Sequence, residues 1–115
     1  MKKGYPFQTG SGDHFTISVA IESGEILEKY GTLLEKYGYE PNGYCWEGHI
    51  IQILEQEEEG LLDHLEFDPE AGGFYAYADS EKTQLRFIEI LSPVFQDLET
   101  LENYIKAADR DRIDD

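Results

Sequence analysis

The sequence predicts an α+β domain in which helices pack on one face of a small antiparallel sheet. Residues 14–21 alternate apolar and polar side chains, as a strand with one buried face does. A strand of this kind belongs to an antiparallel sheet rather than to a parallel sheet that is buried on both sides. Four later segments repeat apolar residues at helical spacing, and 115 residues suffice for one core. We therefore expect a single domain over residues 1–115, with about three or more strands.

The first half of the chain should contain one strand and two helices. Residues 1–13 are rich in glycine and polar residues and are predicted to be an irregular lead-in. After the strand, Ser23 can cap a helix that ends at Gly38, since glycine is favoured at a helix C-terminus. Asn42 and Gly43 then predict a tight turn with positive φ angles, and a second helix follows.

The second half should contribute two strands and two helices. In chain order these are strands at 65–68 and 74–78 and helices at 85–95 and 98–105. The connection between the two strands is short and contains two glycines, so a hairpin is expected. Pro93 should break or kink its helix because proline clashes with the preceding turn. Residues 109–115 are predicted to be a frayed tail, which gives the overall order β-α-α-β-β-α-α.

Net charge is the outstanding feature of the composition. Asp and Glu number 25 against 9 Lys and Arg, giving a formal charge of −16 and a pI near 4.3. Nucleic acids and anionic membranes repel such a protein, so neither is an expected partner. No apolar run is long enough to span a membrane, no secretory signal is recognisable, and the single Cys45 cannot form an internal disulfide. We expect a cytoplasmic protein whose partner is basic.

Negative charge is concentrated in the middle of the chain. No lysine or arginine occurs from residue 37 to residue 81, a stretch that contains twelve acidic residues. Such a field can raise the association rate of a basic partner by roughly 10–10³-fold, although it can also be no more than a soluble surface. Tyrosines among the acids suit a protein interface. The candidate partner-binding residues are Glu57, Glu58, Glu59, Asp63, Glu66, Asp68, Glu70, Tyr75 and Tyr77.

Catalytic and metal-binding patterns are weak in this sequence. Cys45 and His49 could share a helix face as nucleophile and base, but an acidic environment raises a thiol pKa and opposes activation. Asp68 and Glu70 could act as paired carboxylates, although an Asp before Pro is typical of a turn. The potential metal ligands are His49, Asp63, His64 and Glu66. No zinc-site or EF-hand spacing connects them, so we expect no metal, no cofactor and no enzyme activity.

Two segments carry a more specific pattern. Residues 42–46 read N-G-Y-C-W at the start of a helix, and residues 67–77 read F-D-P-E-A-G-G-F-Y-A-Y. Together they resemble the immunity protein 51 family, with a similarity that extends over roughly residues 14–105. Similar proteins often have a bulky residue after the motif glycine, where this chain has Gly73. The residues that we expect to be structural are Asn42, Gly43, Tyr44, Trp46, Phe67, Pro69, Gly72 and Phe74.

The resemblance implies an antidote in a bacterial polymorphic-toxin or contact-dependent inhibition system. Members of this family are small cytoplasmic proteins, and the resemblance implies binding and neutralisation of a cognate toxin without catalysis. Together with the charge, it predicts that acidic and tyrosine side chains cover a basic active site of the toxin. Two alternatives stay open, an acidic interaction module with a non-toxin partner and, with weaker support, a small hydrolase that uses Asp68, Glu70 or the Cys45–His49 pair.

Overall fold

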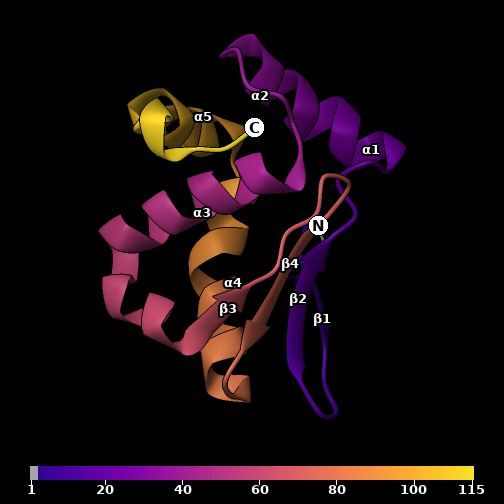
Figure 1. The fold of residues 1–115 in the computed structure, drawn as a ribbon, viewed down its shortest axis with the longest axis vertical. Coiled ribbons are helices and arrows are strands. Elements are labelled where there is room, and N and C mark those ends of the chain that lie inside the picture. The colour runs from indigo at the N-terminus through magenta and orange to yellow at the C-terminus, as the bar shows by residue number, and fades with distance from the viewer. Residues whose placement is uncertain (1–2) are drawn as a thin grey trace.

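Four short strands form one antiparallel sheet. The computed structural model describes residues 3–115. Its strands are β1 (Gln8–Gly10), β2 (Phe15–Val19), β3 (Leu65–Phe67) and β4 (Phe74–Ala78). They lie in the order β1-β2-β4-β3, and all three pairings are antiparallel (Figure 1). The predicted hairpin is confirmed, since β3 and β4 pair with Phe67 opposite Ala76.

The other regular elements are helices and helical turns. In chain order they are α1 (Gly24–Ile26), a π-helical turn (Leu27–Gly31), α2 (Thr32–Lys36), α3 (Gly43–Glu58), a 3₁₀ helix (Glu59–His64), α4 (Glu81–Gln96), α5 (Leu98–Ala107) and a final 3₁₀ turn (Arg110–Arg112). The first three are continuous and correspond to the helix predicted between Ser23 and Gly38, where Gly38 has the expected positive φ of 85°.

The helices cover only one face of the sheet, so the α+β class and the one-sided packing are confirmed. Along β2 the side chains of Ile17 and Val19 are buried, and along β4 those of Phe74 and Ala76 are buried. These residues share the face that carries the core, where Phe74 stacks on Phe87 of α4 at a ring separation of 6.4 Å. The alternate residues of both strands point to the other face.

The predicted lead-in contains an edge strand. Thr9 of β1 lies opposite Ile17 of β2, and the Gln84 side-chain amide donates to the carbonyl oxygens of Gly10 and Thr16 at 2.8 and 2.9 Å. Phe7 is buried, with its ring 5.2 Å from that of Phe87. Three residues are too few for alternation to show, so this strand is defined by its tertiary contacts rather than by a local pattern.

Asn42 and Gly43 begin a helix and do not form the predicted positive-φ turn. Asn42 has a φ of −106°, and its side-chain oxygen accepts a hydrogen bond of 2.9 Å from the backbone N–H of Cys45, as an N-cap does. Gly43 is required for a different reason. A Cβ atom there would collide with the carbonyl oxygens of Glu70 and Gly73 in the β3–β4 turn.

Of the two effects predicted for Pro93, a break or a kink of its helix, the break is wrong. Helix α4 continues through it to Gln96. Proline at this position removes one backbone hydrogen bond, to the carbonyl of Glu89. The final turn is nevertheless held in place, because Val94 and Phe95 are buried against the core.

The last seven residues are docked rather than frayed. The Arg110 guanidinium donates to the carbonyl oxygens of Tyr37 and Gly38 at 3.0 and 2.6 Å. Ile113 is only 7% exposed and lies over Gly48 of α3. The backbone carbonyl of Asp115 accepts a hydrogen bond of 2.8 Å from the Asn42 amide. Charged residues dominate this segment in sequence, so its one buried apolar side chain gives no periodic signal.

Candidate functional site

The two motif segments lie against each other. The backbone N–H of Gly43 donates to the carbonyl of Ala71 at 3.2 Å, so the start of α3 abuts the turn between β3 and β4. That turn is closed by hydrogen bonds in both directions between the backbones of Glu70 and Gly73, at 2.9 and 3.2 Å. On its other side, a Cβ atom at Gly72 would lie 2.5 Å from the Glu22 carboxylate. The motif pattern therefore encodes a close contact between helix and hairpin.

The remaining motif residues divide between core and surface. Trp46 is 2% exposed, with its indole stacked on Phe95 at 5.2 Å. Phe74 is fully buried, and the half-buried Phe67 ring is 6.1 Å from it. Tyr44 is 41% exposed, although it is one of the motif residues that the sequence predicts to be structural. Pro69 is half-buried just after β3.

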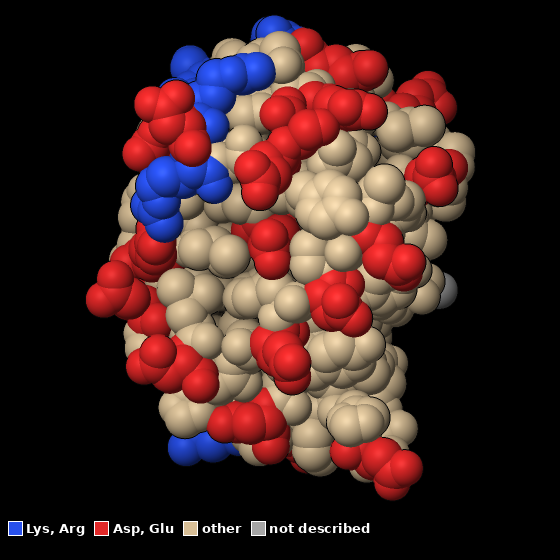
Figure 2. Space-filling view, in the orientation of Figure 1, with Lys and Arg blue, Asp and Glu red and all other residues tan. Residues whose placement is uncertain are grey.

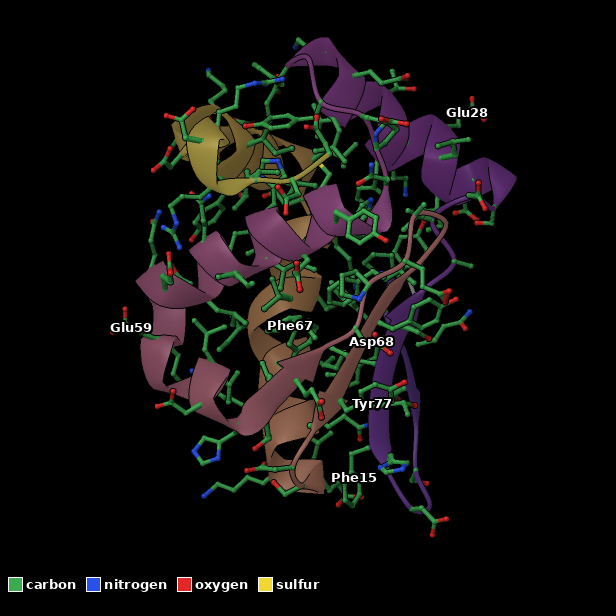
Figure 3. All side chains as sticks on the ribbon, viewed as in Figure 1. Phe15, Glu28, Glu59, Phe67, Asp68 and Tyr77 are labelled. Carbon is green, nitrogen blue, oxygen red and sulfur yellow. The ribbon has the colours of Figure 1, made fainter. Side chains whose placement is uncertain are left out.

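The first group of candidate binding residues lies where α3 ends and will be called the helix-end acids, Glu57, Glu58, Glu59 and Asp63. Two of them have partners on neighbouring helices. Glu57 accepts a hydrogen bond of 2.6 Å from the Tyr104 hydroxyl of α5, and Glu58 accepts one of 2.7 Å from Arg86 of α4. Glu59 and Asp63 are exposed, and Figure 3 shows Glu59 at the outer edge of the helical side.

The second group lies on the uncovered side of the sheet. Glu66 is directly opposite Tyr77, which is opposite Thr16, so these three side chains form one row across the sheet. Asp68 follows β3, and its backbone N–H donates to the carbonyl of Tyr75 at 2.9 Å. Tyr75 in turn is opposite Ser18. The two rows, Glu66–Tyr77–Thr16 and Asp68–Tyr75–Ser18, will be called the open sheet face.

Glu70 belongs to the rim of this face. It is exposed in the turn between β3 and β4, where Gly72 lies against the Glu22 carboxylate. Asp68 and Tyr77 are labelled along the same side of the molecule in Figure 3. The structure thus brings Glu66, Asp68 and Glu70 together with the tyrosines of β4 and places the helix-end acids elsewhere.

Cations are absent from the strands and from the turns that connect them. Among the described residues, none from 4 to 28 and none from 37 to 81 is Lys or Arg. Several of the remaining cations pair with acids of the helical side, where Arg112 contacts Glu55 at 2.6 Å and Lys36 contacts Glu102 at 2.8 Å. In the view of Figure 2, Lys and Arg gather along the upper left edge and at the bottom, while Asp and Glu are scattered among uncharged residues over the rest of this side.

Cys45 and His49 are both in α3, but neither is available for chemistry. Cys45 is 0% exposed, and burial raises the pKa of its thiol to about 12, so the thiol is neutral. His49 is 4% exposed and has the Tyr39 ring 4.7 Å away. Among residues 3–115, the buried Nε2 of His49 and the indole N–H of Trp46 have no hydrogen-bond partner, and both residues line one small cavity. A nucleophile–base pair is not supported by this geometry.

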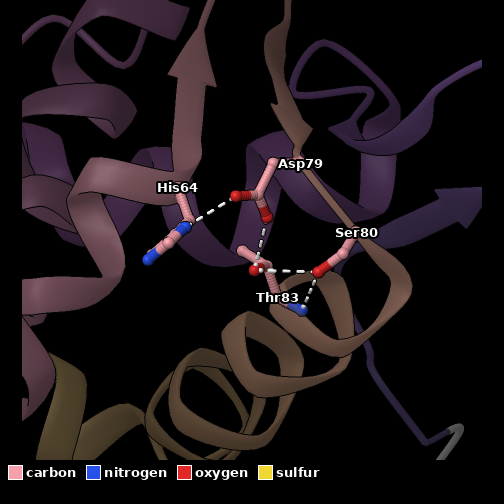
Figure 4. A network of polar contacts seen from close by, with 4 residues as sticks. All are labelled: His64, Asp79, Ser80 and Thr83. Carbon is pink, nitrogen blue, oxygen red and sulfur yellow. Dashed lines mark hydrogen bonds and ion pairs between the residues drawn. The ribbon is translucent and has the colours of Figure 1, made fainter.

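A polar network not anticipated from the sequence joins the end of the 3₁₀ helix, just before β3, to the start of α4 (Figure 4). Nδ1 of His64 lies 2.6 Å from one oxygen of Asp79, and the Thr83 hydroxyl donates to the other oxygen at 2.7 Å. These hydrogen bonds, with that from Thr83 first, lower the pKa of the Asp79 carboxyl. The Ser80 side chain caps α4 by accepting from the Thr83 N–H. Ser80 contacts Thr83 rather than His64, so the group is a structural clamp, not a nucleophile with its base.

The described residues contain neither a cluster of metal-ligating side chains nor a helix suited to span a membrane. In residues 3–115, no three His, Cys, Asp or Glu side chains are grouped as metal ligands. His49 is buried in the helical layer, whereas His64 is exposed and contacts Asp79. Asp68 and Glu70 are exposed and lie at a turn. Over the same range, no helix combines the length and the apolar character that a membrane span needs.

Acid should destabilise the protein through His49. Burial lowers the pKa of this imidazole to about 4, against about 6.5 in an unfolded chain. The unfolded state therefore takes up the proton first, and stability that is present above pH 6.5 is lost as the pH falls towards 4. The loss is on the order of 3 kcal/mol. Chemical denaturation between pH 7 and pH 4 would measure it.

The His49→Leu variant is the control for this pH dependence, because it cannot take up a proton at this position. We expect its stability to fall less between pH 7 and pH 4 than that of the wild type. Since both proteins share every other titrating group, including the Glu55 carboxyl whose pKa is lowered by Arg112, the difference isolates residue 49. Identical pH profiles for the two proteins would contradict a neutral buried imidazole.

Comparisons with known proteins give one match. A family model described as immunity protein 51 matches residues 13–110. The matched range includes β2, β3, β4, the five α-helices and both motif segments. No curated protein and no solved structure matched the chain.

Proposed function

Because this chain belongs to the immunity protein 51 family, we propose that it binds a cognate bacterial toxin domain and neutralises it by covering a basic active site. The family match over residues 13–110 is the observation that carries this proposal. The chain acts in the cytoplasm, where the toxin would otherwise act, and the neutralisation needs no catalysis, no cofactor and no metal. Buried, neutral Cys45 and His49 are consistent with a binding protein.

Charge supports the choice of partner. A formal charge of −16 gives long-range attraction to a basic protein and repulsion from nucleic acid. A toxin that acts on nucleic acid must have a basic substrate cleft, so an acidic surface can occupy that cleft and exclude the substrate. The candidate contacts form two separate groups, the helix-end acids on one part of the surface and Glu66, Asp68, Glu70, Tyr75 and Tyr77 on another, and one of the two groups would meet the toxin.

The size of the protein is adequate for such a complex. A standard interface buries about 800 Å² on each partner. The chain exposes 6452 Å² in total, so the toxin would cover roughly one eighth of the surface. The uncovered side of the sheet and the helix-end acids lie on different parts of the surface, and either could provide an area of this kind.

The test uses the toxin domain encoded immediately upstream of this chain, where an antidote's target is expected. We expect equimolar chain to abolish the activity of the purified toxin domain and to form a stable complex with it. The association rate should fall steeply as salt rises from 50 to 500 mM, because electrostatic attraction is screened. A toxin that keeps full activity in a molar excess of the chain would refute the proposal.

A second candidate is an interaction module with a basic partner that is not a toxin. The same charge distribution favours it, since attraction to a cationic protein does not depend on what that protein does. Expression of the toxin domain in cells separates the two functions. Only an antidote restores growth when it is produced together with the toxin.

A further inference from the structure

We infer that the open sheet face, rather than the helix-end acids, makes the central contact with the toxin, and that it receives arginine side chains of the toxin surface. This inference rests on the proposed function and assigns it to one side of the molecule. The open sheet face consists of Thr16, Ser18, Glu66, Asp68, Tyr75 and Tyr77, with Glu70 at its rim.

The first argument is that this face has no helix over it. Core residues of β2 and β4 are at most 8% exposed, because the helices lie against their side of the sheet (Figure 1). On the other side, Tyr75 is 37% exposed and Tyr77 is half-buried. Two aromatic side chains on the uncovered side of a sheet provide a broad and rigid contact surface of the kind found at the centre of interfaces.

The second argument is that the acids of this face are not neutralised within the strands. Glu66, Asp68, Glu70 and the adjacent Glu22 come from segments of the chain that contain no Lys or Arg. At the helix end, in contrast, Arg86 contacts Glu58 and the Tyr104 hydroxyl contacts Glu57. Lys3 lines one hollow with Gln8 of β1 and another with His64 and Asp79, and among the described residues no Lys or Arg forms an ion pair with Glu66, Asp68 or Glu70. The open sheet face therefore has carboxylates free for a partner's cations.

The third argument concerns the chemistry of the partner. Carboxylates next to tyrosine rings match the arginine guanidinium, which forms paired hydrogen bonds with a carboxylate and stacks on an aromatic ring. The rows pair Glu66 with Tyr77 and Asp68 with Tyr75, so each tyrosine has a carboxylate beside it. Lysine would satisfy the charge but not the stacking. A toxin surface with two or more arginines is the expected complement.

The fourth argument is that the face is held in one geometry before binding. Glu70 and Gly73 contact Gly43 at the start of α3, which fixes the turn at one end of β3 and β4. At the other end, His64 and Asp79 are joined by a side-chain contact of 2.6 Å and by a backbone hydrogen bond of 3.0 Å. A surface fixed in this way loses little conformational entropy when it binds.

Two variants of equal charge test the inference. The sheet-face variant is Glu66→Lys with Asp68→Lys, and the matched control is Glu59→Lys with Asp63→Lys at the helix end. Each replaces two exposed acids and changes the formal charge from −16 to −12, so long-range attraction is altered equally. We expect the sheet-face variant to dissociate from the toxin domain about 100-fold faster or more, and the control less than about fivefold faster. Thermal melting of each variant alone verifies that it is folded.

Radical footprinting of the wild-type complex gives an independent measurement that needs no variant. We expect Tyr75 and Tyr77 to be protected from oxidation when the toxin domain is bound. Leu85 of α4, which is 54% exposed on the helical side, should react as in the free chain.

The possible outcomes separate the inference from the proposed function. If the wild-type chain does not bind or inhibit the toxin domain, the proposed function fails. If the wild type binds but the sheet-face variant dissociates no faster than the control, or if Leu85 rather than the tyrosines is protected, this inference is overturned while the proposed function stands.

Discussion

Replacement of Trp46 by alanine should lower the free energy of unfolding by about 3–5 kcal/mol, as expected for a large buried aromatic residue. Its indole is 2% exposed, stacks on Phe95 at 5.2 Å and meets the Tyr30 ring edge-on at 5.5 Å. Alanine would leave a cavity between α3 and α4 that the tightly packed rings cannot close. Urea denaturation followed by circular dichroism measures the loss.

Two further variants show whether the effect comes from burial. Trp46→Phe keeps a ring at this position and removes an indole N–H that has no partner among the described residues, so we expect it to cost less than half as much. Tyr44→Ala changes an aromatic residue of the same motif that is 41% exposed, and should alter stability by about 0.5 kcal/mol or less. Equal losses for Trp46→Ala and Tyr44→Ala would show that Trp46 is not a core residue.

Replacement of Gly43 by alanine should also be severe, with a loss of at least about 2 kcal/mol. The new methyl group would meet the carbonyl oxygens of Glu70 and Gly73, and backbone atoms cannot turn aside as a side chain can. Either α3 or the β3–β4 turn would have to move, which would break the hydrogen bond from Gly43 to Ala71. Thermal unfolding and the proton spectrum of the hairpin residues would reveal the change.

Gly24 is the matched control. It is also the first residue of a helix, but no atom lies within 4 Å of a Cβ atom built there. We expect Gly24→Ala to leave the free energy of unfolding unchanged or to raise it by up to ~1 kcal/mol, because alanine favours the helix. If Gly43→Ala were as harmless as Gly24→Ala, the helix–hairpin contact would not be the reason for glycine in the motif.

Periodic segments were predictable because their pattern is local. The strand from Phe15 to Val19 and the helix from Glu81 to Gln96 each bury one face, so the spacing of apolar residues reveals them. The strand at Gln8–Gly10 depends on Gln84, which is distant in sequence, and no pattern within three residues could show it. The docking of the final residues was unpredictable for the same reason, because Ile113 is their one buried apolar side chain and their hydrogen bonds join residues distant in sequence, such as Tyr37 and Asn42.

The candidate site was predictable in composition but not in arrangement. The sequence shows twelve acids without a cation between residues 37 and 81, and this suggests one continuous acidic surface. Arg86 and Arg112, which lie outside that range, fold back to contact Glu58 and Glu55. Successive residues of α3 also point about 100° apart, so Glu57 and Glu58 face different helices. Only the structure separates these acids from those of the open sheet face.

The docked final residues bear on how the protein should be produced in the laboratory. The family match ends at residue 110 and begins at residue 13. A shortened version trimmed to those limits would lack the β1 edge strand. It would also lack Ile113, which lies over Gly48, the residue that precedes the buried His49. An affinity tag at the C-terminus would be attached next to Asn42, because the side-chain amide of Asn42 donates a hydrogen bond to the Asp115 carbonyl. Protein that contains residues 1–115, with its tag placed at the N-terminus, is therefore the better material for binding studies.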